Sequence, residues 1–252
     1  MNLGLQARIA LVAGASRGIG LAVASTLHAE GCRVAMAARG REALEAAALG
    51  LGAAASAHVA DLTASGAATA LVERVLARWG RIDVLVCSVG SGASVPPGTE
   101  TEAEWHRVLT LNLHSATALI AAARPAMRAA GGGAIVCISS ICGIAALGAP
   151  VTYSAAKAAL NATVRGLARP LARDGIRITA VAPGNIMFEG GAWARKLEAD
   201  RDGVQRMLET EVAQARLGTP AEVADFVAFL ASPRAAFVTG SIHVADGGQL
   251  RG

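Results

Sequence analysis

The chain has 252 residues, of which 53% are hydrophobic and 17% are charged, and its formal net charge at pH 7 is +4. An intrinsically disordered protein combines low hydrophobicity with high net charge, so this composition excludes one. The length suits one large α/β domain, or two small ones, with a full-sized core. The basic residues stand singly rather than in a run, which argues against nucleic-acid binding.

Seven short apolar runs alternate with longer helical patterns along the chain. The predicted strands are 9–13, 33–38, 55–60, 82–88, 134–139, 177–181 and 242–244. The predicted helices are 18–30, 41–50, 64–79, 101–129, 152–173 and 220–231. Most strands are continuously apolar, which is typical of a parallel sheet covered on both faces. This alternation predicts one α/β domain over residues 1–252, a doubly wound parallel sheet of about seven strands with helices on both faces.

Two of the predicted helices begin with capping residues. Thr219 and Glu222 have the spacing of a capping box, and Pro220 stands at the first helical position. Thr101 and Glu104 have the same spacing, which predicts a second capping box.

The segment 185–216 interrupts the alternation before the last helix. It combines the bulky residues Phe188 and Trp193 with Gly190 and Gly191. Glycines beside large apolar side chains suit a mobile segment that covers a pocket. We therefore predict a substrate-binding lid over 185–216; the alternative is an ordinary pair of surface helices.

An uncharged stretch, residues 129–156, is long enough to span a bilayer. Its several glycines and Pro150 would leave backbone groups unpaired in lipid, so we interpret it as a buried strand, a turn and a helix start. The N-terminus does not resemble a signal peptide, and we expect a cytoplasmic protein with no membrane segment. The cysteines form no CxxC pair and the histidines are scattered, so we expect no metal site.

The turn between the first strand and the first helix is rich in glycine. Its candidate binding residues are Gly14, Ser16, Arg17, Gly18, Ile19 and Gly20. Glycine permits a tight bend and a close approach of the backbone to a phosphate, and the helix start offers free N–H groups. At a first strand–helix turn this spacing predicts a site for the pyrophosphate of a nicotinamide dinucleotide.

The end of the second strand bears on which dinucleotide binds. It lacks the acidic residue that accepts hydrogen bonds from the ribose 2′-hydroxyl of NAD, and Arg39 follows instead. Arg39 and Arg17 can bind a 2′-phosphate through bidentate hydrogen bonds. We predict that NADP(H) is preferred over NAD(H); the alternative is that Arg39 is merely solvated.

The single tyrosine, Tyr153, stands four residues before Lys157, one of only two lysines. This spacing places both side chains on one face of a helix. A free phenol has a pKa of about 10, and an ammonium about 5 Å away lowers it by about two units at an effective dielectric of about 20. We predict Tyr153 as a general acid and base; the alternative is a tyrosine that only covers a helix face.

With these motifs the sequence resembles the short-chain dehydrogenase/reductase family over nearly its whole length. The matching motifs are the glycine-rich turn, Tyr153-x-x-x-Lys157, Pro183-Gly184 and Asp246-Gly247-Gly248. The resemblance implies a single NAD(P)-binding domain of Rossmann type. The members that reduce 3-oxoacyl groups on a carrier protein are similar.

The resemblance also implies the roles of individual residues. The catalytic residues would be Asn112, Ser140, Tyr153 and Lys157. Ser140 is selected over Ser139 because the family's serine lies thirteen residues before the tyrosine. Ser140 would hold the carbonyl oxygen, Tyr153 would protonate it, Lys157 would bind the nicotinamide ribose, and Asn112 would anchor a water. Further cofactor contacts would come from Asp61, Leu62, Gly90, Pro183, Gly184 and Ile186.

The chain departs from the family pattern at three places. Ser88 stands where the family commonly has the second Asn of Asn-Asn-Ala-Gly, which puts a cofactor contact there in question. Ala13 replaces a threonine whose hydroxyl supports the glycine-rich turn. Phe188 replaces a threonine after Pro-Gly, which removes one polar cofactor contact.

The resemblance implies an NADP(H)-dependent oxidoreductase that interconverts a ketone and a secondary alcohol. The expected pocket is lined by Ser91–Val95, Ile141–Leu147, Asn185–Phe188 and Trp193, which are mostly apolar and uncharged. We expect an uncharged small-molecule ketone or a carrier-bound ketoacyl group, although sugar-alcohol and steroid dehydrogenases share the framework. A homodimer or homotetramer is implied. The alternative is a non-catalytic NADP(H)-binding sensor or scaffold.

Overall fold

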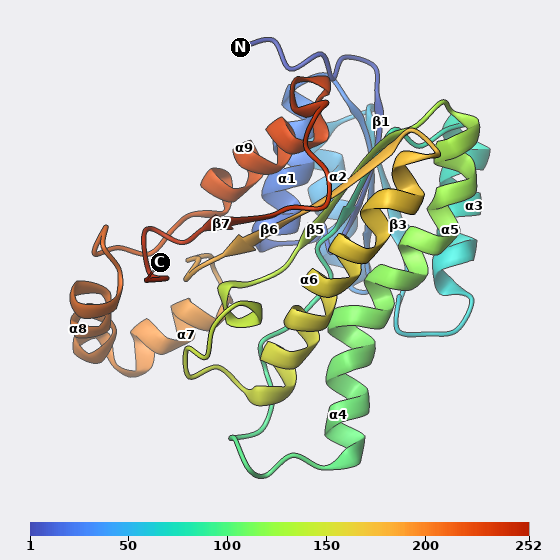
Figure 1. Cartoon of the computed structure of the whole chain (residues 1–252). Helices are drawn as coiled ribbons and strands as arrows, with labels where there is room; N and C mark the ends of the chain where they lie inside the picture. Colours follow the sequence, from blue (N-terminus) through green and yellow to red (C-terminus); the bar gives the residue numbers. More distant parts are fainter. Residues whose placement is uncertain (252) are drawn as a thin grey trace.

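A parallel sheet of seven strands forms the centre of the computed structural model, which describes residues 1–251 (Figure 1). The strand order is β3-β2-β1-β4-β5-β6-β7, and every pairing is parallel. The strands are β1 (Ile9–Ala13), β2 (Arg33–Ala38), β3 (Ala55–Val59), β4 (Val84–Cys87), β5 (Gly133–Ile138), β6 (Ile176–Pro183) and β7 (Ile242–Ala245). The predicted doubly wound α/β fold is therefore confirmed.

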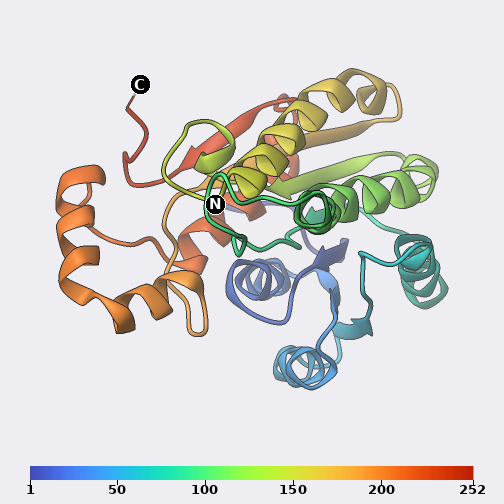
Figure 2. The same cartoon turned by 90° about the horizontal axis from the view of Figure 1, so that it is seen from below.

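Helices cover both faces of the sheet (Figure 2). One face carries α1 (Gly18–Ala29), α2 (Arg41–Leu51) and α9 (Pro220–Ala231). The other carries α3 (Ala67–Trp79), α5 (Ser115–Ala129) and α6 (Val151–Ala172). The remaining helices are α4 (Glu102–Leu109), α7 (Ala192–Ala199) and α8 (Arg201–Glu211), with short helical turns η1 (Thr110–His114), η2 (Ile141–Gly143) and η3 (Pro233–Ala235).

Strand β1 shows why the strands are unbroken apolar runs in the sequence. Ile9 and Leu11 belong to the core beneath α3, α5 and α6, whereas Ala10 and Val12 belong to the core beneath α1, α2 and α9. Side chains of a strand alternate between the two faces. Because both faces are buried, every position has to be apolar.

The long helix predicted over 101–129 is the largest difference from the sequence-based elements. A single π-helical turn, Thr110–His114, separates α4 from α5. The helix predicted from residue 64 begins at Ala67, because the Asp61 carboxylate accepts a hydrogen bond from the Thr63 amide and Gly66 takes a left-handed conformation (φ 75°). Short-range hydrogen bonds of this kind favour a turn over a helix.

The two capping predictions have different outcomes. The Thr219 hydroxyl and the Glu222 carboxylate cap α9 reciprocally, as predicted. At α4 only half of the predicted box forms. The Thr101 hydroxyl accepts a hydrogen bond from the Glu104 amide, but the Glu104 carboxylate binds other groups.

Residues 1–251 contain neither a membrane-spanning helix nor a cluster of metal-binding side chains. None of the helices described there is long and apolar enough to cross a membrane. The same residues contain no group of three or more His, Cys, Asp or Glu side chains arranged to hold a metal ion.

Candidate functional site

The predicted site residues lie at the carboxyl edge of the sheet. Gly14 follows β1, Gly90 follows β4, Ser140 follows β5 and Gly184 follows β6. The chain winds outward from β1 to β3 and then returns to place β4 on the other side of β1. In open α/β sheets, ligands bind outside the carboxyl ends of the strands at such a reversal.

Two positions of the glycine-rich turn after β1 have room only for glycine. A β-carbon on Gly14, whose φ is 81°, would lie 2.7 Å from the carbonyl oxygen of Ser88. One on Gly20 would overlap the carbonyl oxygen of Gly14. The first glycine thus allows the turn to pass β4, and the third allows α1 to pack on the turn.

The start of α1 has backbone donors that no side chain caps. Its N-cap residue, Arg17, makes no side-chain capping bond, and its first turn contains no acidic residue. The first N–H groups of a helix have no partner within the helix, and they lie at its positive end. The turn and helix start therefore fit the pyrophosphate of a dinucleotide, with donors at Gly18 and Ile19.

The ring of Phe188 lies against this helix start. A β-carbon on Gly18 would be 2.9 Å from ring carbon Cε2 of Phe188, and one on Gly191 would be 3.1 Å from Cε1 and Cζ. The Gly191 amide donates to the Phe188 carbonyl at 3.0 Å, which closes a tight turn around the ring. The segment after β6 thus reaches across to the glycine-rich turn.

The groups expected near an adenosine lie around the ends of β2 and β3. The Asp61 carboxylate accepts hydrogen bonds from the hydroxyl and the amide of Thr63, at 2.7 and 3.0 Å. These bonds lower the pKa of Asp61, and the Arg39 charge lowers it further. Leu62 is buried in the core, whereas Arg39 is exposed. The guanidinium of Arg17 instead lies by Gly190, with Nη1 3.7 Å from a β-carbon placed there.

The four predicted catalytic residues come together at this edge. Tyr153 and Lys157 share one face of α6, with Lys157 Nζ 5.8 Å from the centre of the Tyr153 ring. Nζ donates to the carbonyl of Ile138 at 2.8 Å. A β-carbon on Gly90 would lie 2.7 Å from Asn112 Oδ1 and 3.2 Å from Lys157 Nζ. Only glycine therefore fits between these two side chains.

The two serines after β5 have different partners. The Ser139 hydroxyl donates to Asn161 Oδ1 at 2.6 Å, and Asn161 Nδ2 donates to the carbonyl of Gly143 at 3.1 Å. Ser140 Oγ accepts from the Cys142 amide at 3.1 Å, and its hydroxyl lies near enough to Tyr153 to lower the pKa of the phenol. Ser139 therefore ties β5 to α6, while Ser140 faces the phenol.

Burial controls the ionisation of the tyrosine and the lysine. It raises the pKa of Tyr153 to about 12, against the hydrogen bond from Ser140, which favours the phenolate. Burial also lowers the pKa of Lys157 to about 8. The prediction that Lys157 brings the phenol pKa toward neutrality is wrong for this structure. Taking an ionisable group out of water disfavours its charged form, and here that effect outweighs the nearby ammonium.

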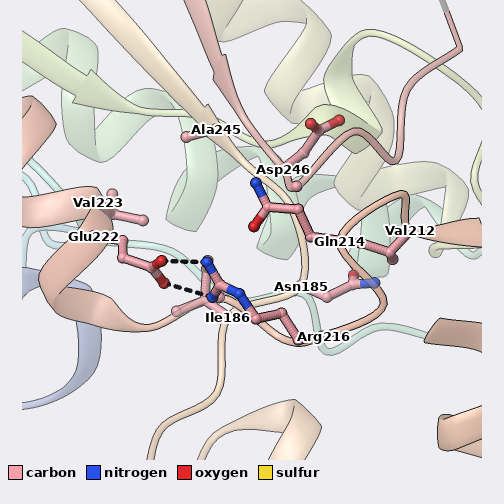
Figure 3. Close-up of a pocket in the computed structure, with 11 residues that line it drawn as sticks. Asn185, Ile186, Val212, Gln214, Arg216, Glu222, Val223, Ala245 and Asp246 are labelled. Carbon is pink, nitrogen blue, oxygen red and sulfur yellow. Dashed lines mark hydrogen bonds and ion pairs between the residues drawn. The ribbon is translucent and has the colours of Figure 1, made fainter. Parts of the chain in front are cut away.

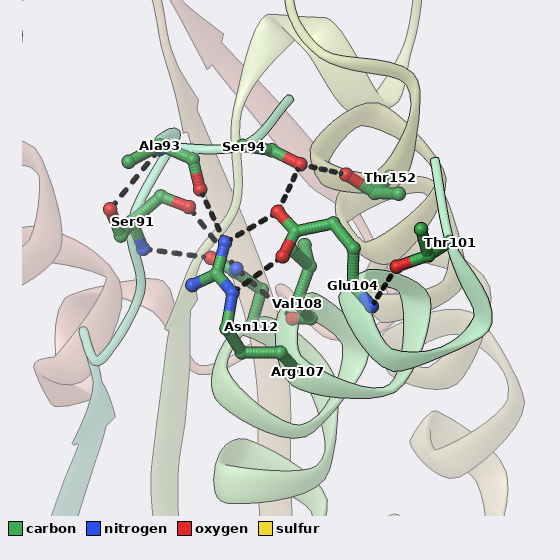
Figure 4. A network of polar contacts seen from close by, with 9 residues as sticks. All are labelled: Ser91, Ala93, Ser94, Thr101, Glu104, Arg107, Val108, Asn112 and Thr152. Atoms are coloured by element: carbon green, nitrogen blue, oxygen red, sulfur yellow. Dashed lines mark hydrogen bonds and ion pairs between the residues drawn. The ribbon is translucent and has the colours of Figure 1, made fainter. Parts of the chain in front are cut away.

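Asn112 lies in the π-helical turn and binds the segment after β4. Its Nδ2 donates to the carbonyls of Val108 and Ser91, at 3.1 and 3.2 Å, and its Oδ1 accepts from the Ser91 amide at 3.0 Å (Figure 4). Such turns occur often at functional sites. The side chain of Asn112 is thus fully engaged with backbone.

Sequence reasoning missed a charged pair behind the same segment. Glu104 accepts hydrogen bonds from Arg107 and from the Ser94 hydroxyl, and these lower its pKa to about 2 (Figure 4). Ser94 Oγ is also 2.6 Å from Thr152 Oγ1, next to Tyr153. The three-residue spacing of Glu104 and Arg107 was the only signal in the sequence, and it does not show what the pair contacts.

A cavity of about 180 Å³ lies beside the predicted substrate site (Figure 3). It is lined by Asn185, Ile186, Val212, Gln214, Arg216, Gly218, Glu222, Val223, Ala245, Asp246 and Gly247. The ion pair of Arg216 and Glu222 closes one side. Of the expected pocket lining only Asn185 and Ile186 take part, and the four catalytic residues do not. Unlike the uncharged lining we expected, this cavity is partly ionic.

The segment 185–216 contains the helix pair α7 and α8. Val204, Leu208 and Val212 form a small core of their own, against which Trp193 packs. Lys196 Nζ lies 4.2 Å from the centre of the Trp193 ring. Trp193, which we expected in the pocket lining, therefore takes part in the contact between the two helices.

Known proteins resemble this chain over almost its whole length. The family model described as enoyl-(acyl carrier protein) reductase matches residues 14–249. The 3-oxoacyl-(acyl-carrier-protein) reductase FabG of Escherichia coli is 35% identical over 247 residues, covering 97% of this chain and 98% of that protein. The cis-4-hydroxycyclohexanecarboxylate dehydrogenase of Sinomonas cyclohexanicum is 37% identical over 244 residues, with 96% of each chain covered.

Solved structures agree with these relatives. The L-sorbose reductase of Gluconobacter frateurii, solved with NADPH and L-sorbose, superposes with a TM-score of 0.95 at 31% identity and full coverage of both chains. A 3-oxoacyl-(acyl-carrier-protein) reductase of Agrobacterium tumefaciens, solved with NADP, gives 0.91 at 30% identity, covering 98% of this chain and 95% of that one. The fold, the motif order and these similarities show that the chain belongs to the short-chain dehydrogenase/reductase family and is an oxidoreductase of carbonyl or alcohol groups.

Proposed function

We propose that this protein is an NADP(H)-dependent reductase that interconverts a ketone and a secondary alcohol. The observation that carries the proposal is the meeting of Ser140, Tyr153 and Lys157 at the same sheet edge as an uncapped, glycine-rich helix start. An anion site and a proton donor at one sheet edge suit hydride transfer coupled to proton transfer.

Each residue has a distinct part in this reaction. When bound, the nicotinamide supplies or accepts a hydride. Ser140 donates a hydrogen bond to the carbonyl oxygen and stabilises the negative charge that grows on it. Tyr153 gives its phenolic proton to that oxygen, or takes it back in the oxidation. Lys157 holds the ribose hydroxyls and favours the phenolate once the proton has left.

We propose a second part for Asn112 besides anchoring the water that connects Lys157 to solvent. Its side-chain amide binds both the backbone amide and the carbonyl of Ser91, so it shapes the segment after β4. Gly90 lies between Asn112 and Lys157 and keeps them close.

Replacing Tyr153 tests the chemistry. We expect Tyr153→Phe to abolish ketone-dependent loss of NADPH absorbance and to leave the Kd of NADPH nearly unchanged, because only the hydroxyl is lost. Substantial residual turnover would refute the role of Tyr153. NADPH binding without turnover by the unmodified protein, over a broad ketone panel, would instead favour a non-catalytic sensor or scaffold.

The proposed preference for NADP(H) rests on Arg39 and Arg17. Arg39 is exposed at the end of β2, which lacks the acidic residue that would accept hydrogen bonds from a ribose 2′-hydroxyl. The L-sorbose reductase and the Agrobacterium reductase were solved with NADPH and NADP. We expect Arg39→Ala to lower the ratio of kcat/KM for NADPH to that for NADH. Arg41→Ala is the matched control, since Arg41 pairs with Glu45. An unchanged ratio in Arg39→Ala would contradict the assignment.

We further propose a carrier-bound 3-oxoacyl group or a small apolar ketone as the substrate. The similarity to FabG supports the first, and the net charge of +4 would suit an acidic carrier. The similarity to a sugar reductase and a cyclic alcohol dehydrogenase supports a free small molecule. Rates with 3-oxoacyl groups on a carrier, compared with sugar and cyclic ketones, distinguish them.

We also propose that the protein is a cytoplasmic homodimer or homotetramer, with 185–216 as a lid within the single domain 1–252. Strand β7 is an edge strand whose Val244 is half exposed, and Phe237, which precedes this strand in the chain, is fully exposed. Large exposed apolar side chains at a free sheet edge favour association. A monomeric mass in light scattering would contradict the assembly.

A further inference from the structure

The segment from Gly90 to Ser94 runs along the catalytic face of α6. A β-carbon on Gly90 would lie 3.2 Å from Lys157 Nζ, and one on Gly92 would lie 3.9 Å from Cε1 of Tyr153. Two residues further on, Ser94 Oγ lies 2.6 Å from Thr152 Oγ1. Every second residue of the segment thus faces α6, as in an extended chain. Two glycines and a serine allow this close approach.

The hydroxyl of Ser94 connects the segment to a charged group on α4. Ser94 Oγ lies 2.7 Å from Glu104 Oε1. The pKa of Glu104 is lowered to about 2, so its carboxylate is ionised and can only accept hydrogen bonds. The single proton of Ser94 therefore goes to Glu104, and the Thr152 hydroxyl must donate to Ser94.

Arg107 fixes the far end of this chain of hydrogen bonds. Its Nε donates to Glu104 Oε2 at 2.7 Å, and its Nη2 donates to Glu104 Oε1 at 2.6 Å. The same Nη2 donates to the carbonyl of Ala93 at 3.0 Å. The guanidinium thus holds both the carboxylate and the backbone of the segment (Figure 4).

The near end of the chain is buried at the base of the tyrosine. Thr152 has no exposed surface, and it directly precedes Tyr153 in the first turn of α6. Its hydroxyl is thus tied to the segment and not to solvent. A buried hydroxyl without its partner costs free energy, so the contact specifies one arrangement of segment and helix.

We propose that the chain Thr152–Ser94–Glu104–Arg107 is a positioning network that sets the distance between the segment 90–94, as a wall of the substrate site, and the phenol of Tyr153. Ser94 and Thr152 are its positioning residues. The kinetic consequence rests on the proposed reductase function. The mechanical consequence, a segment held against α6, does not depend on the proposed function.

The test compares Thr152→Val, which keeps the side-chain shape and removes the hydroxyl, with Thr152→Ser, which keeps the hydroxyl. Thr163→Val is the matched control, because the Thr163 hydroxyl binds only the Ala159 carbonyl of α6. We expect Thr152→Val to speed amide hydrogen exchange in residues 91–95 by about tenfold, as for the loss of one hydrogen bond. Thr152→Ser and Thr163→Val should exchange as the unmodified protein does.

The kinetic arm uses the best ketone found for the unmodified protein. We expect Thr152→Val to raise KM about tenfold with a change in kcat below about twofold, since a loosened wall binds the substrate less tightly while Ser140, Tyr153 and Lys157 keep their places. The Kd of NADPH should not change. Ser94→Ala should give the same pattern. Because Ser94 lies on a loop, this variant tests the network independently if Thr152→Val misfolds.

The outcomes separate the two proposals. Unchanged exchange in residues 91–95 of both Thr152→Val and Ser94→Ala would overturn the network. Faster exchange with unaltered KM would overturn its role in positioning. If the unmodified protein reduces no ketone, the reductase function fails, while the exchange arm still decides whether the network holds the segment.

Discussion

Gly90 shows how a single missing side chain organises the site. It lies where Lys157 Nζ and Asn112 Oδ1 approach each other, and a β-carbon there would be 3.2 and 2.7 Å from these atoms. Neither neighbour can withdraw easily, because Nζ is bonded to Ile138 and the Asn112 amide to Ser91. A small change at this residue therefore displaces two functional groups together.

We accordingly expect Gly90→Ala to lower kcat about 100-fold, the size of effect that a misplacement of about 1 Å produces. Gly92→Ala is the control, because its added carbon reaches only ordinary contact with Tyr153, at 3.9 Å. Steady-state kinetics of both variants measure the effect. Equal loss in the two would show that any added bulk in the segment is harmful, contrary to this account.

The buried ammonium of Lys157 gives the stability a defined pH dependence. Its folded-state pKa, about 8, lies below the ordinary value of 10.5, so between these pH values the unfolded chain binds more protons than the folded one. Lys157 therefore contributes an increase in the free energy of unfolding with pH in this window, by at most about 1.4 kcal/mol per unit, and the raised pKa values of the buried Cys32 and Cys87 thiols oppose it above about pH 9. Above pH 10 the raised pKa of Tyr153 acts in the opposite sense.

Urea unfolding at pH 8 and pH 9.5 tests this linkage. We expect the change in unfolding free energy from pH 8 to pH 9.5 to be less positive in Lys157→Met than in the unmodified protein, because Lys157→Met has no ammonium proton to release. Lys196→Met, at the only other lysine and at an exposed position, should show the same change as the unmodified protein. An equal change in Lys157→Met and the unmodified protein would mean that the Lys157 ammonium is not destabilised by burial.

At the scale of elements, the strands were predictable and the contacts between loops were not. Strand β1 matched its predicted bounds because both faces are buried, so its apolar run ends where the sheet ends. The contacts of Phe188 with Gly18 and of Ser94 with Thr152 join segments distant in the sequence. No local pattern encodes such a pairing, because it depends on how the strands align.

The ionisation of the site was unpredictable for a related reason. The four-residue spacing of Tyr153 and Lys157 correctly placed them on one helical face. The pKa of each depends on how completely its surroundings exclude water, and burial of both groups comes from several elements. Spacing therefore gives the neighbour of a group but not its solvation.

The segment after β6 yields a prediction about cofactor affinity. Because the Phe188 ring lies against Gly18 at the start of α1, it has to move before an anion can reach the first amides. We expect Phe188→Thr to lower the Kd of NADPH about three- to tenfold, since the binding-competent state is then more populated. NADPH fluorescence titration measures this Kd.

Phe237→Thr provides the control for that substitution, because Phe237 is fully exposed and far from α1 in the chain. Its Kd for NADPH should match that of the unmodified protein. Weaker binding by Phe188→Thr would instead assign the ring a favourable contact with the dinucleotide.

At the scale of the molecule, the two edges of the sheet have different roles. The carboxyl edge carries the candidate site. At the amino edge the Asp83 carboxylate, only 4% exposed, accepts hydrogen bonds from Arg81, Arg8 and the Ile9 amide, and so joins the starts of β1 and β4. Burial raises the pKa of Asp83, but these hydrogen bonds outweigh it and lower the pKa overall.

Removing the charge of Asp83 should therefore affect stability alone. We expect Asp83→Asn to lower the free energy of unfolding by about 2 kcal/mol at pH 7, the cost of losing charged hydrogen bonds at a buried group. The difference from the unmodified protein should shrink on acidification, because a carboxylate with a lowered pKa loses its contribution as it is protonated. NADPH affinity should stay the same, and a changed affinity would link the two edges.

The π-helical turn between α4 and α5 lets the long helix hold one extra residue without rotating its two halves against each other. A π turn holds one residue more than an α turn. In a regular α-helix each added residue would rotate every following side chain by about 100°. The turn Thr110–His114 absorbs the extra residue locally instead, so α4 and α5 keep their faces. Deleting one residue from 110–114 would therefore let a regular helix run through with both halves in place, and the loss would fall on the turn itself, where Asn112 binds Ser91.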